Sequence, residues 1–167
     1  MLTDFAIENY RSIKDIWLKL EPVTVIVGPN GCGKSNLYRA LALLASAATG
    51  ELARNMAEEG GPDKINFGRP HPPHPVTKLS VRTQSLQYDL VIGCPMSAPR
   101  GLALGGFEVR YERIDRIVRG TRNNLLRRKG HSISLVMTAI GSPSTSTTTG
   151  SSAAVWSRTP IFRSSTR

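Results

Sequence analysis

The stretch VTVIVGPNGCGKS, residues 23–35, decides the fold of this chain of 167 residues. Its first part, Val23 to Val27, is an unbroken run that is rich in β-branched residues and ends at Gly28. Such a run is typical of a buried parallel strand. From Lys34 onward the apolar residues recur at helical spacing. A strand, a glycine-rich turn and a helix in direct succession therefore predict a helix N-terminus presented at the end of a strand.

The turn itself, GPNGCGKS at residues 28–35, matches the phosphate-binding pattern G-x-x-x-x-G-K-[ST]. Its glycines let the backbone approach a phosphate closely, and the amides from Gly31 to Ser35 can form one concave nest. Lys34 would place its charge on the β and γ phosphates, and Ser35 would offer a hydroxyl to Mg²⁺. A chance glycine-rich turn is the alternative, and the flanking strand and helix patterns disfavour it.

The rest of the chain supplies further elements around this motif. Partial alternation predicts strands at Leu2–Tyr10 and Ile16–Leu20, which pair with each other. A helix is expected from Lys34 to Ala48, ended by Gly50, and a short second helix at 51–59. Strand-like sequence follows at 76–93 and 107–112, whereas the Pro-rich residues 68–75 and the Gly- and Pro-rich residues 95–106 are expected to form loops.

Charge is distributed unevenly along the chain. Lys and Arg number 22 against 12 Asp and Glu, a formal net charge of +10. Residues 1–66 hold seven basic and eight acidic residues, so the remaining fifteen basic and four acidic residues give the second part a net charge of +11. No acidic residue follows Asp115. The basic run from Arg110 to Lys129 could contact nucleic-acid phosphates, or it could be a solvated face whose acidic partners lie elsewhere.

The last 36 residues, 132–167, differ in character from the rest. They contain seventeen Ser or Thr and three Arg, and only Ile133, Leu135 and Val136 hint at an apolar period. Such sequence is not expected to build a core. Two interpretations fit: a natural disordered linker, or translation out of frame after a shift near residue 131. The second would also explain why later motifs are missing.

Two segments resemble a known family. GPNGCGKSNL at 28–37 is similar to the ATP-binding segment of RecF-like and SMC-type, ABC-class P-loop ATPases, and FAIENYRSI at 5–13 is similar to their opening strand and turn. The stretch 41–61, ending in AEEGG, resembles the bacterial predicted ATPases of the AAA family. The resemblance is clear over 1–66, loose over 76–130 and absent after about residue 131.

The resemblance implies an α/β P-loop NTPase with an ABC/SMC-type nucleotide-binding lobe and an antiparallel β subdomain, present here in its N-terminal portion. Together with the composition change near residue 131, it divides the chain into three expected segments: an ATP-binding segment at 1–66, an antiparallel β subdomain with the Pro-rich loop and basic stretch at 67–131, and a low-complexity tail at 132–167. It further implies ATP and Mg²⁺ as ligands, a head-to-head homodimer, and work on DNA in repair, chromosome maintenance or defence. Lys34 would be catalytic, Ser35 would bind the metal, and Arg11 would approach the nucleotide. The nucleotide-binding residues would otherwise be Gly28, Pro29, Asn30, Gly31, Cys32, Gly33, Lys34, Ser35 and Asn36.

The chain also departs from that family. No hydrophobic run ends in Asp-Glu, as the Walker B strand would, and no LSGG-like signature is present; the nearest strings are at 101–106 and 147–152. Gln84 and Gln87 are candidates for the family's Mg²⁺-binding glutamine. We therefore expect ATP binding with negligible hydrolysis by this chain. A non-hydrolysing regulatory module and a basic nucleic-acid-binding protein with a vestigial nucleotide site are the alternatives.

The remaining signals are weaker. His71, His74 and His131 lack clustered Cys or acidic residues, so a metal site is not expected there. Cys32 and Cys94 cannot form a disulfide framework, which favours a reducing, cytoplasmic location. Cys32 lies within the phosphate loop, where the helix N-terminus could make its thiol more reactive, although a small tolerated side chain is the favoured interpretation. No apolar run is long enough to span a membrane, and no signal peptide is expected.

Overall fold

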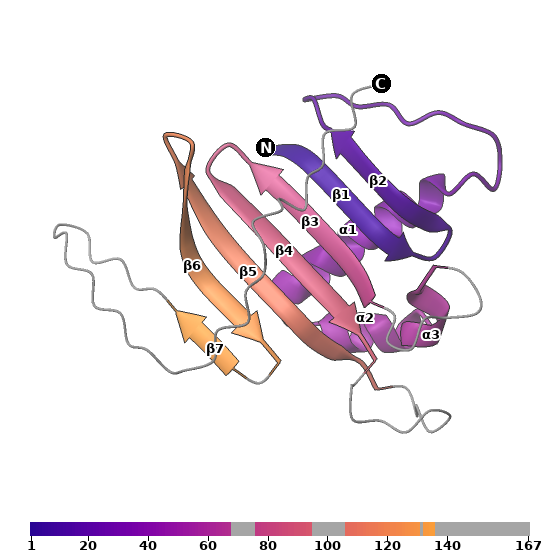
Figure 1. Cartoon of the computed structure of the whole chain (residues 1–167). Helices are drawn as coiled ribbons and strands as arrows, with labels where there is room; N and C mark the ends of the chain where they lie inside the picture. The colour runs from indigo at the N-terminus through magenta and orange to yellow at the C-terminus, as the bar shows by residue number, and fades with distance from the viewer. Residues whose placement is uncertain (68–75, 95–105, 131, 136–167) are drawn as a thin grey trace, which may run out of the picture. The chain divides into compact units, whose positions relative to one another are not determined.

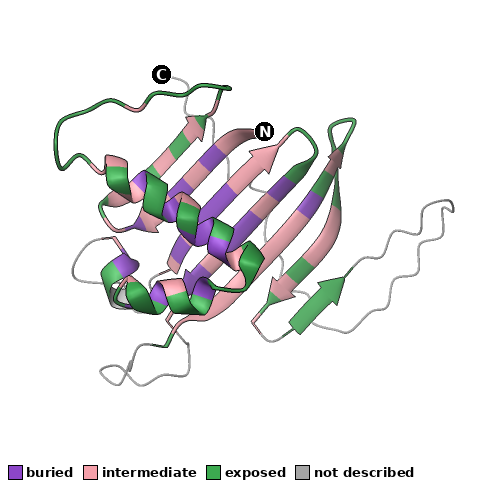
Figure 2. Ribbon diagram, turned by 180° about the vertical axis from the view of Figure 1, so that it is seen from behind, coloured by how far each residue is buried: buried purple, intermediate pink, exposed green. Residues whose placement is uncertain are grey.

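The computed structural model describes residues 1–67, 76–94, 106–130 and 132–135. These residues form one sheet of seven antiparallel strands, with helices on one of its faces (Figures 1 and 2). The strand order across the sheet is β2-β1-β3-β4-β5-β6-β7. The strands are β1 Leu2–Tyr10, β2 Ile13–Lys19, β3 Val76–Thr83, β4 Leu86–Gly93, β5 Glu108–Val118, β6 Thr121–Lys129 and β7 Ser132–Leu135. The helices are α1 Lys34–Thr49, α2 Leu52–Glu58 and α3 Pro62–Ile65.

The first hairpin confirms the predicted pairing of the two N-terminal strands. β1 and β2 are antiparallel neighbours, with Ile7 opposite Ile16, and β2 begins a few residues earlier than its apolar alternation indicates. The other edge of β1 pairs with β3, with Ile7 opposite Leu79. One sheet therefore contains strands from both the 1–66 segment and the 67–131 segment.

The core lies between the sheet and helix α1. Side chains at every second position of β1, β3 and β4 face the helices, and Ile7, Leu79 and Leu90 are each only 1% exposed. The spacing in α1 turns Leu37, Ala40, Leu43 and Leu44 toward this face, where all four are buried (Figure 2). The helix ends at Gly50, whose φ of 78° is the left-handed conformation that glycine adopts readily. The predicted helices at 34–48 and 51–59 are thus confirmed.

The predicted parallel strand at Val23–Val27 is wrong. These residues form no strand, and Val23, Val25 and Val27 are 82%, 77% and 84% exposed. Only Ile26 packs against the core. The physical reason is the absence, among the described residues, of a strand beside this run, because a β-branched run can be buried only when strands and helices surround it. Within the described part of the chain, every strand pairing is antiparallel, so the parallel component of the predicted α/β fold is not formed there.

The edge of the sheet opposite β2 contains two strands, β6 and β7, that the apolar pattern did not predict. β6 has few apolar side chains, yet it pairs along its length with β5. β7 forms at 132–135, within the segment for which no structure was expected, and its Ile133 and Leu135 are 55% and 67% exposed. The predicted loop at 68–75, all of the predicted loop at 95–106 except Gly106, the three histidines and residues 136–167 lie outside the described residues. None of the described helices is long and apolar enough to cross a membrane.

Candidate functional site

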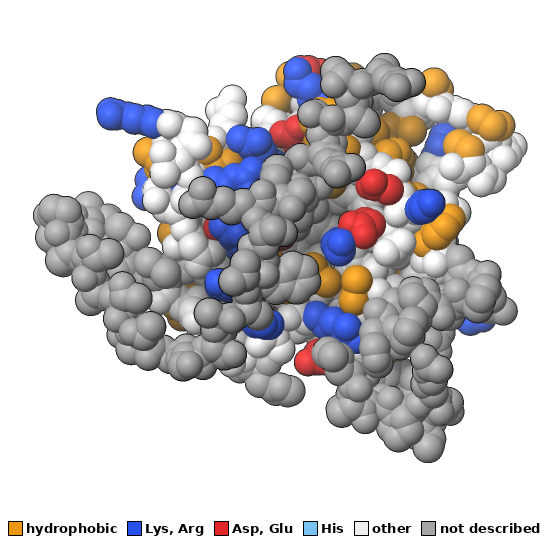
Figure 3. Space-filling view, viewed as in Figure 1, with side chains coloured by type: hydrophobic (Ala, Val, Ile, Leu, Met, Phe, Trp, Pro, Cys, Tyr) orange, Lys and Arg blue, Asp and Glu red, His pale blue; other side chains and the backbone are white. Residues whose placement is uncertain are grey.

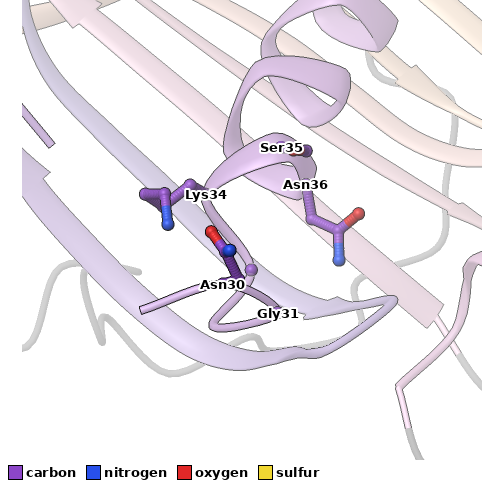
Figure 4. A pocket seen from close by; sticks show the side chains of 6 residues that line it. Asn30, Gly31, Lys34, Ser35 and Asn36 are labelled. Atoms are coloured by element: carbon purple, nitrogen blue, oxygen red, sulfur yellow. The ribbon is translucent and has the colours of Figure 1, made fainter. Parts of the chain in front are cut away.

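The glycine-rich loop leads directly into helix α1 and forms a small pocket there (Figure 4). The pocket has a volume of about 230 Å³, below the range of roughly 300–1,000 Å³ that whole-ligand sites occupy. Its lining comes from the predicted motif and the residue that follows it: Asn30, Gly31, Gly33, Lys34, Ser35 and Asn36. A pocket of this size suits a phosphate group rather than an entire nucleotide.

Two glycines of the loop are required by its conformation, and a third lies close to a neighbouring side chain. Gly31 and Gly33 have φ of 82° and 99°, which side-chain-bearing residues rarely adopt. A Cβ on Gly33 would lie 3.0 Å from the Ser12 hydroxyl, and a Cβ on Gly28 would lie 2.8 Å from Cys32 Sγ. The glycine positions predicted from the motif therefore have a steric basis in this loop.

The backbone at the start of α1 leaves donors available. The amides of Asn36 and Leu37 donate to the Gly33 carbonyl at 2.9 and 3.3 Å. In the described structure, the amides of Gly31, Gly33, Lys34 and Ser35 donate to no backbone carbonyl. Unpaired amides at a helix N-terminus, together with the positive end of the helix dipole, favour an anion.

Lys34 extends along the loop. Its Nζ donates to the carbonyls of Gly28 and Pro29 at 2.7 and 2.8 Å, and lies 3.8 Å from Cys32 Sγ. An ammonium group has three donors, and two are used by these carbonyls. Figure 4 shows Lys34 and Asn36 on opposite sides of the loop, with Asn30 between them. Lys34 thus both stabilises the loop and brings a positive charge to the pocket.

The other residues predicted for the site lie in different surroundings. Ser35 lines the pocket beside Lys34, and its hydroxyl is the type of ligand that Mg²⁺ accepts. Among the described residues, no Asp or Glu lines this pocket. Gln84 is in the turn between β3 and β4, and Gln87 is buried in β4, where its amide donates to Asp89 at 3.0 and 3.2 Å. Neither glutamine lines the pocket.

Arg11 is engaged by an acidic residue of the second helical segment. Its Nε and Nη2 donate to Glu59 at 3.1 and 2.9 Å, and the Tyr10 hydroxyl donates to the same Glu59 oxygen at 2.8 Å. Burial of the phenol, then its hydrogen bond to Glu59 and the Glu59 charge, raise the pKa of Tyr10 well above its ordinary value. The approach of Arg11 to a nucleotide stays a prediction.

Comparison with known proteins agrees with the loop and its surroundings. Residues 1–79 match the family model described as an AAA ATPase domain. A stretch of 57 residues is 37% identical to the DNA replication and repair protein RecF of Beutenbergia cavernae, covering 34% of this chain and 14% of that protein. The predicted resemblance to RecF-like ATPases is confirmed for the N-terminal portion. A stretch of 44 residues is 48% identical to an OLD nuclease of Thermus scotoductus, covering 26% of this chain and 8% of the nuclease.

The chain spans only a small part of the relatives that it matches, 8% of the nuclease and 14% of RecF. At the level of the family, AAA ATPase domains bind a nucleotide and usually use Mg²⁺, which agrees with the loop chemistry above. The matched region, 1–79, contains β1, β2, the phosphate loop, all three helices and the start of β3.

Motif spacing missed two residues of the site region, Ser12 and Glu59. The Ser12 hydroxyl accepts a hydrogen bond from Asn36 Nδ2 at 2.8 Å, and Glu59 holds Tyr10 and Arg11. Ser12 stands in the NYRSI segment that carries the family resemblance, so that segment was the available signal. Nothing in the local pattern around Glu59 indicates its two partners.

Proposed function

We propose that the chain binds Mg-ATP or Mg-ADP through residues 28–35, as the Walker A phosphate loop of a P-loop NTPase with an ABC/SMC-type nucleotide-binding lobe. The observation that carries the proposal is the pocket itself, where free amides at the start of α1 meet the Lys34 charge and the Ser35 hydroxyl. The amides and the Lys34 ammonium group suit the oxygens of a phosphate. The Ser35 hydroxyl suits the Mg²⁺ ion that accompanies the nucleotide. Phosphates bound in this pocket would leave the nucleoside outside it.

Each predicted ligand then has a defined part. The free amides of Gly31, Gly33, Lys34 and Ser35 bind phosphate oxygens, Lys34 neutralises the β and γ phosphates, and Ser35 binds Mg²⁺, which supplies charge neutralisation to the phosphates. Rapid hydrolysis also needs a group that orients the attacking water. Since the described pocket lining includes no carboxylate, we propose that this chain alone turns ATP over negligibly.

The test is nucleotide titration of the wild type and of Lys34→Ala, with Lys14→Ala as a matched control on an exposed lysine of β2. Removing a charge-assisted contact should weaken binding by about tenfold to a hundredfold. Lys14→Ala should bind like the wild type. Equal affinity in the wild type and Lys34→Ala would overturn the proposal, and Lys34-dependent release of phosphate at several turnovers per second would overturn the claim on hydrolysis.

A second candidate function is nucleic-acid binding. It rests on the basic residues between Arg110 and Lys129 that are exposed and have no ion pair among the described residues. Three members of the basic run are engaged: Arg110 donates to the Cys94 carbonyl, Arg113 pairs with Asp115, and Arg128 pairs with Glu112. The others are exposed and have no ion pair among the described residues: Arg116, Arg119, Arg122, Arg127 and Lys129. Figure 3 shows basic side chains over the β5 and β6 side of the sheet.

The end of the β5–β6 hairpin is exposed and carries part of this basic surface. Val118 pairs with Thr121, so Arg119 and Gly120 form a two-residue turn, with φ of 49° and 78°. Both angles are positive, as in the tight turns that suit twisted hairpins. An Arg at such a position is uncommon, and it projects a guanidinium from the tip of a two-stranded ribbon. A ribbon with this charge fits the phosphates of a duplex.

The test of this candidate is fluorescence anisotropy with a labelled duplex at several salt concentrations. Arg119→Ala and Arg122→Ala should each weaken DNA binding and reduce its salt dependence. The loss of affinity should be similar on duplexes of different sequence, because each variant removes a phosphate contact. Lys34→Ala, which lies in the phosphate loop, is the control and should bind DNA like the wild type. Unchanged binding in both arginine variants would contradict the candidate. Dimerisation and a role in DNA repair or defence stay predictions from the resemblance.

A further inference from the structure

One side-chain contact joins the phosphate loop to the first β-hairpin. Asn36, in the first turn of α1, donates through Nδ2 to the Ser12 hydroxyl at 2.8 Å. The two residues are 24 positions apart in the sequence. A Cβ added to Gly33 would lie 3.0 Å from the same Ser12 hydroxyl. Ser12 thus contacts the third residue of the helix and leaves no room for a side chain at Gly33, the residue before α1.

The turn that carries Ser12 is held firmly from its other side. The Arg11 amide donates to the Ile65 carbonyl, and Tyr10 forms an isolated bridge with Asn66. The Tyr10 side chain is fully buried and donates to Glu59, which also binds the Arg11 guanidinium. Asn9 and Arg11 have φ of 57° and 49°, a conformation that non-glycine residues keep only where their surroundings hold them. Ser12 is therefore presented from a fixed support.

The chain before the loop gives less support. Val23 to Val27 form no strand, and among the described residues the backbone amides of this run donate to no backbone carbonyl. The loop is held by its own Lys34 contacts, by the packing of α1 and by Ser12. A contact from outside the loop matters more where the preceding segment leaves it loosely attached.

We infer that Ser12 is a positioning residue for the phosphate loop, acting through Asn36. Its hydroxyl fixes the first turn of α1, and with it the amides that face the pocket, relative to the β1–β2 hairpin. In this arrangement the Asn36 amide is directed to Ser12, which gives Asn36 a structural part beside the phosphate loop. The inference rests on the proposed nucleotide-binding function for its effect on affinity, but the positioning itself is measurable without nucleotide.

The first test measures hydrogen exchange of the Asn36 and Leu37 amides, which donate to the Gly33 carbonyl, in the nucleotide-free chain. Ser12→Ala should speed their exchange, Asn36→Ala should do the same, and Ser12→Thr, which keeps the hydroxyl, should restore slow exchange. Ser85→Ala is the matched control, because Ser85 is an exposed serine in the turn between β3 and β4. Unchanged exchange in both Ser12→Ala and Asn36→Ala would overturn the inference.

The second test measures Mg-ATP affinity in the same variants. Loss of one neutral hydrogen bond should weaken binding by about twofold to twelvefold in either single variant. The double variant should be no weaker than the singles, because both remove the same contact. The midpoint of thermal unfolding should stay close to that of the wild type, since Ser12 is exposed.

The outcomes separate the inference from the function on which it rests. Nucleotide binding that is lost in Lys34→Ala but unchanged in both Ser12→Ala and Asn36→Ala would overturn positioning alone. A wild-type chain that binds no nucleotide would overturn the proposed function, and the exchange measurement would still decide whether Ser12 fixes the loop. Additive losses in the double variant would show two separate contacts and would also overturn the inference.

Discussion

A Gly33→Ala substitution probes the conformation of the phosphate loop more directly than the removal of any side chain. Gly33 precedes α1 with a φ of 99°, and its missing Cβ faces the Ser12 hydroxyl at 3.0 Å. A left-handed conformation costs a residue with a Cβ about 1–2 kcal/mol, to which the contact with Ser12 adds. In the free chain the loop can relax away from this conformation, because the preceding segment forms no strand. The full conformational cost then appears as a loss of binding free energy, because bound phosphate requires the loop in its wild-type conformation.

The expected loss of Mg-ATP affinity in Gly33→Ala is therefore at least about fivefold to thirtyfold. Gly50→Ala is the control, because Gly50 has a φ of 78°, ends the same helix and has nothing within 4 Å of its missing Cβ. Its cost should appear in the unfolding free energy, measured with urea, and leave nucleotide affinity unchanged. Wild-type affinity in Gly33→Ala, or an equal loss of affinity in Gly50→Ala, would refute the reasoning.

Two further predictions concern the hairpin and the exposed run. The folded state keeps the Tyr10 proton at a pH where the unfolded chain, with an ordinary tyrosine pKa of 10.0, has lost it. The contribution of Tyr10 to the unfolding free energy should therefore be fully present below pH 10 and be lost as the pH rises above 10. In urea titrations at several pH values, Tyr10→Phe should make this loss of stability shallower. An unchanged dependence of the unfolding free energy on pH would contradict the role of the buried Tyr10 proton. Val25 is 77% exposed, so Val25→Lys should alter the unfolding free energy by no more than about 0.5 kcal/mol. The same substitution should reduce self-association in light scattering by interrupting an apolar patch, and a loss of several kcal/mol would mean that Val25 packs in a core.

The helices were predictable because their evidence is local. The spacing of apolar residues in α1 fixes which side is buried, and Gly50 marks the end of the helix. β6 could not be predicted in the same way, because Leu125 and Leu126 are its only apolar residues. That strand forms because β5 offers its edge and the Arg119-Gly120 turn reverses the chain, both of which depend on the neighbouring strand.

The wrong prediction at Val23–Val27 shows that a β-branched run does not by itself make a buried strand. A β-branched run indicates that a segment suits a buried strand, but burial also requires a neighbour on each side. The described sheet places β2 at its edge, and no described strand lies beside the run. The valines at 23, 25 and 27 consequently face solvent, although they alternate as a strand would. The motif that follows is unaffected, because the loop conformation depends on its glycines and on α1.

The phosphate loop was predictable from spacing, but the way it is held was not. Lys34 was assigned to the phosphates, whereas its Nζ also binds two loop carbonyls, so Lys34→Ala removes a charge and a support together. Lower affinity in that variant alone cannot tell which loss is responsible. Ser12→Ala leaves the ammonium group in place and removes only a support. If support dominates, loop exchange and affinity should change in parallel across Lys34→Ala, Ser12→Ala and Gly33→Ala; if charge dominates, Lys34→Ala should lose far more affinity than its exchange rate indicates.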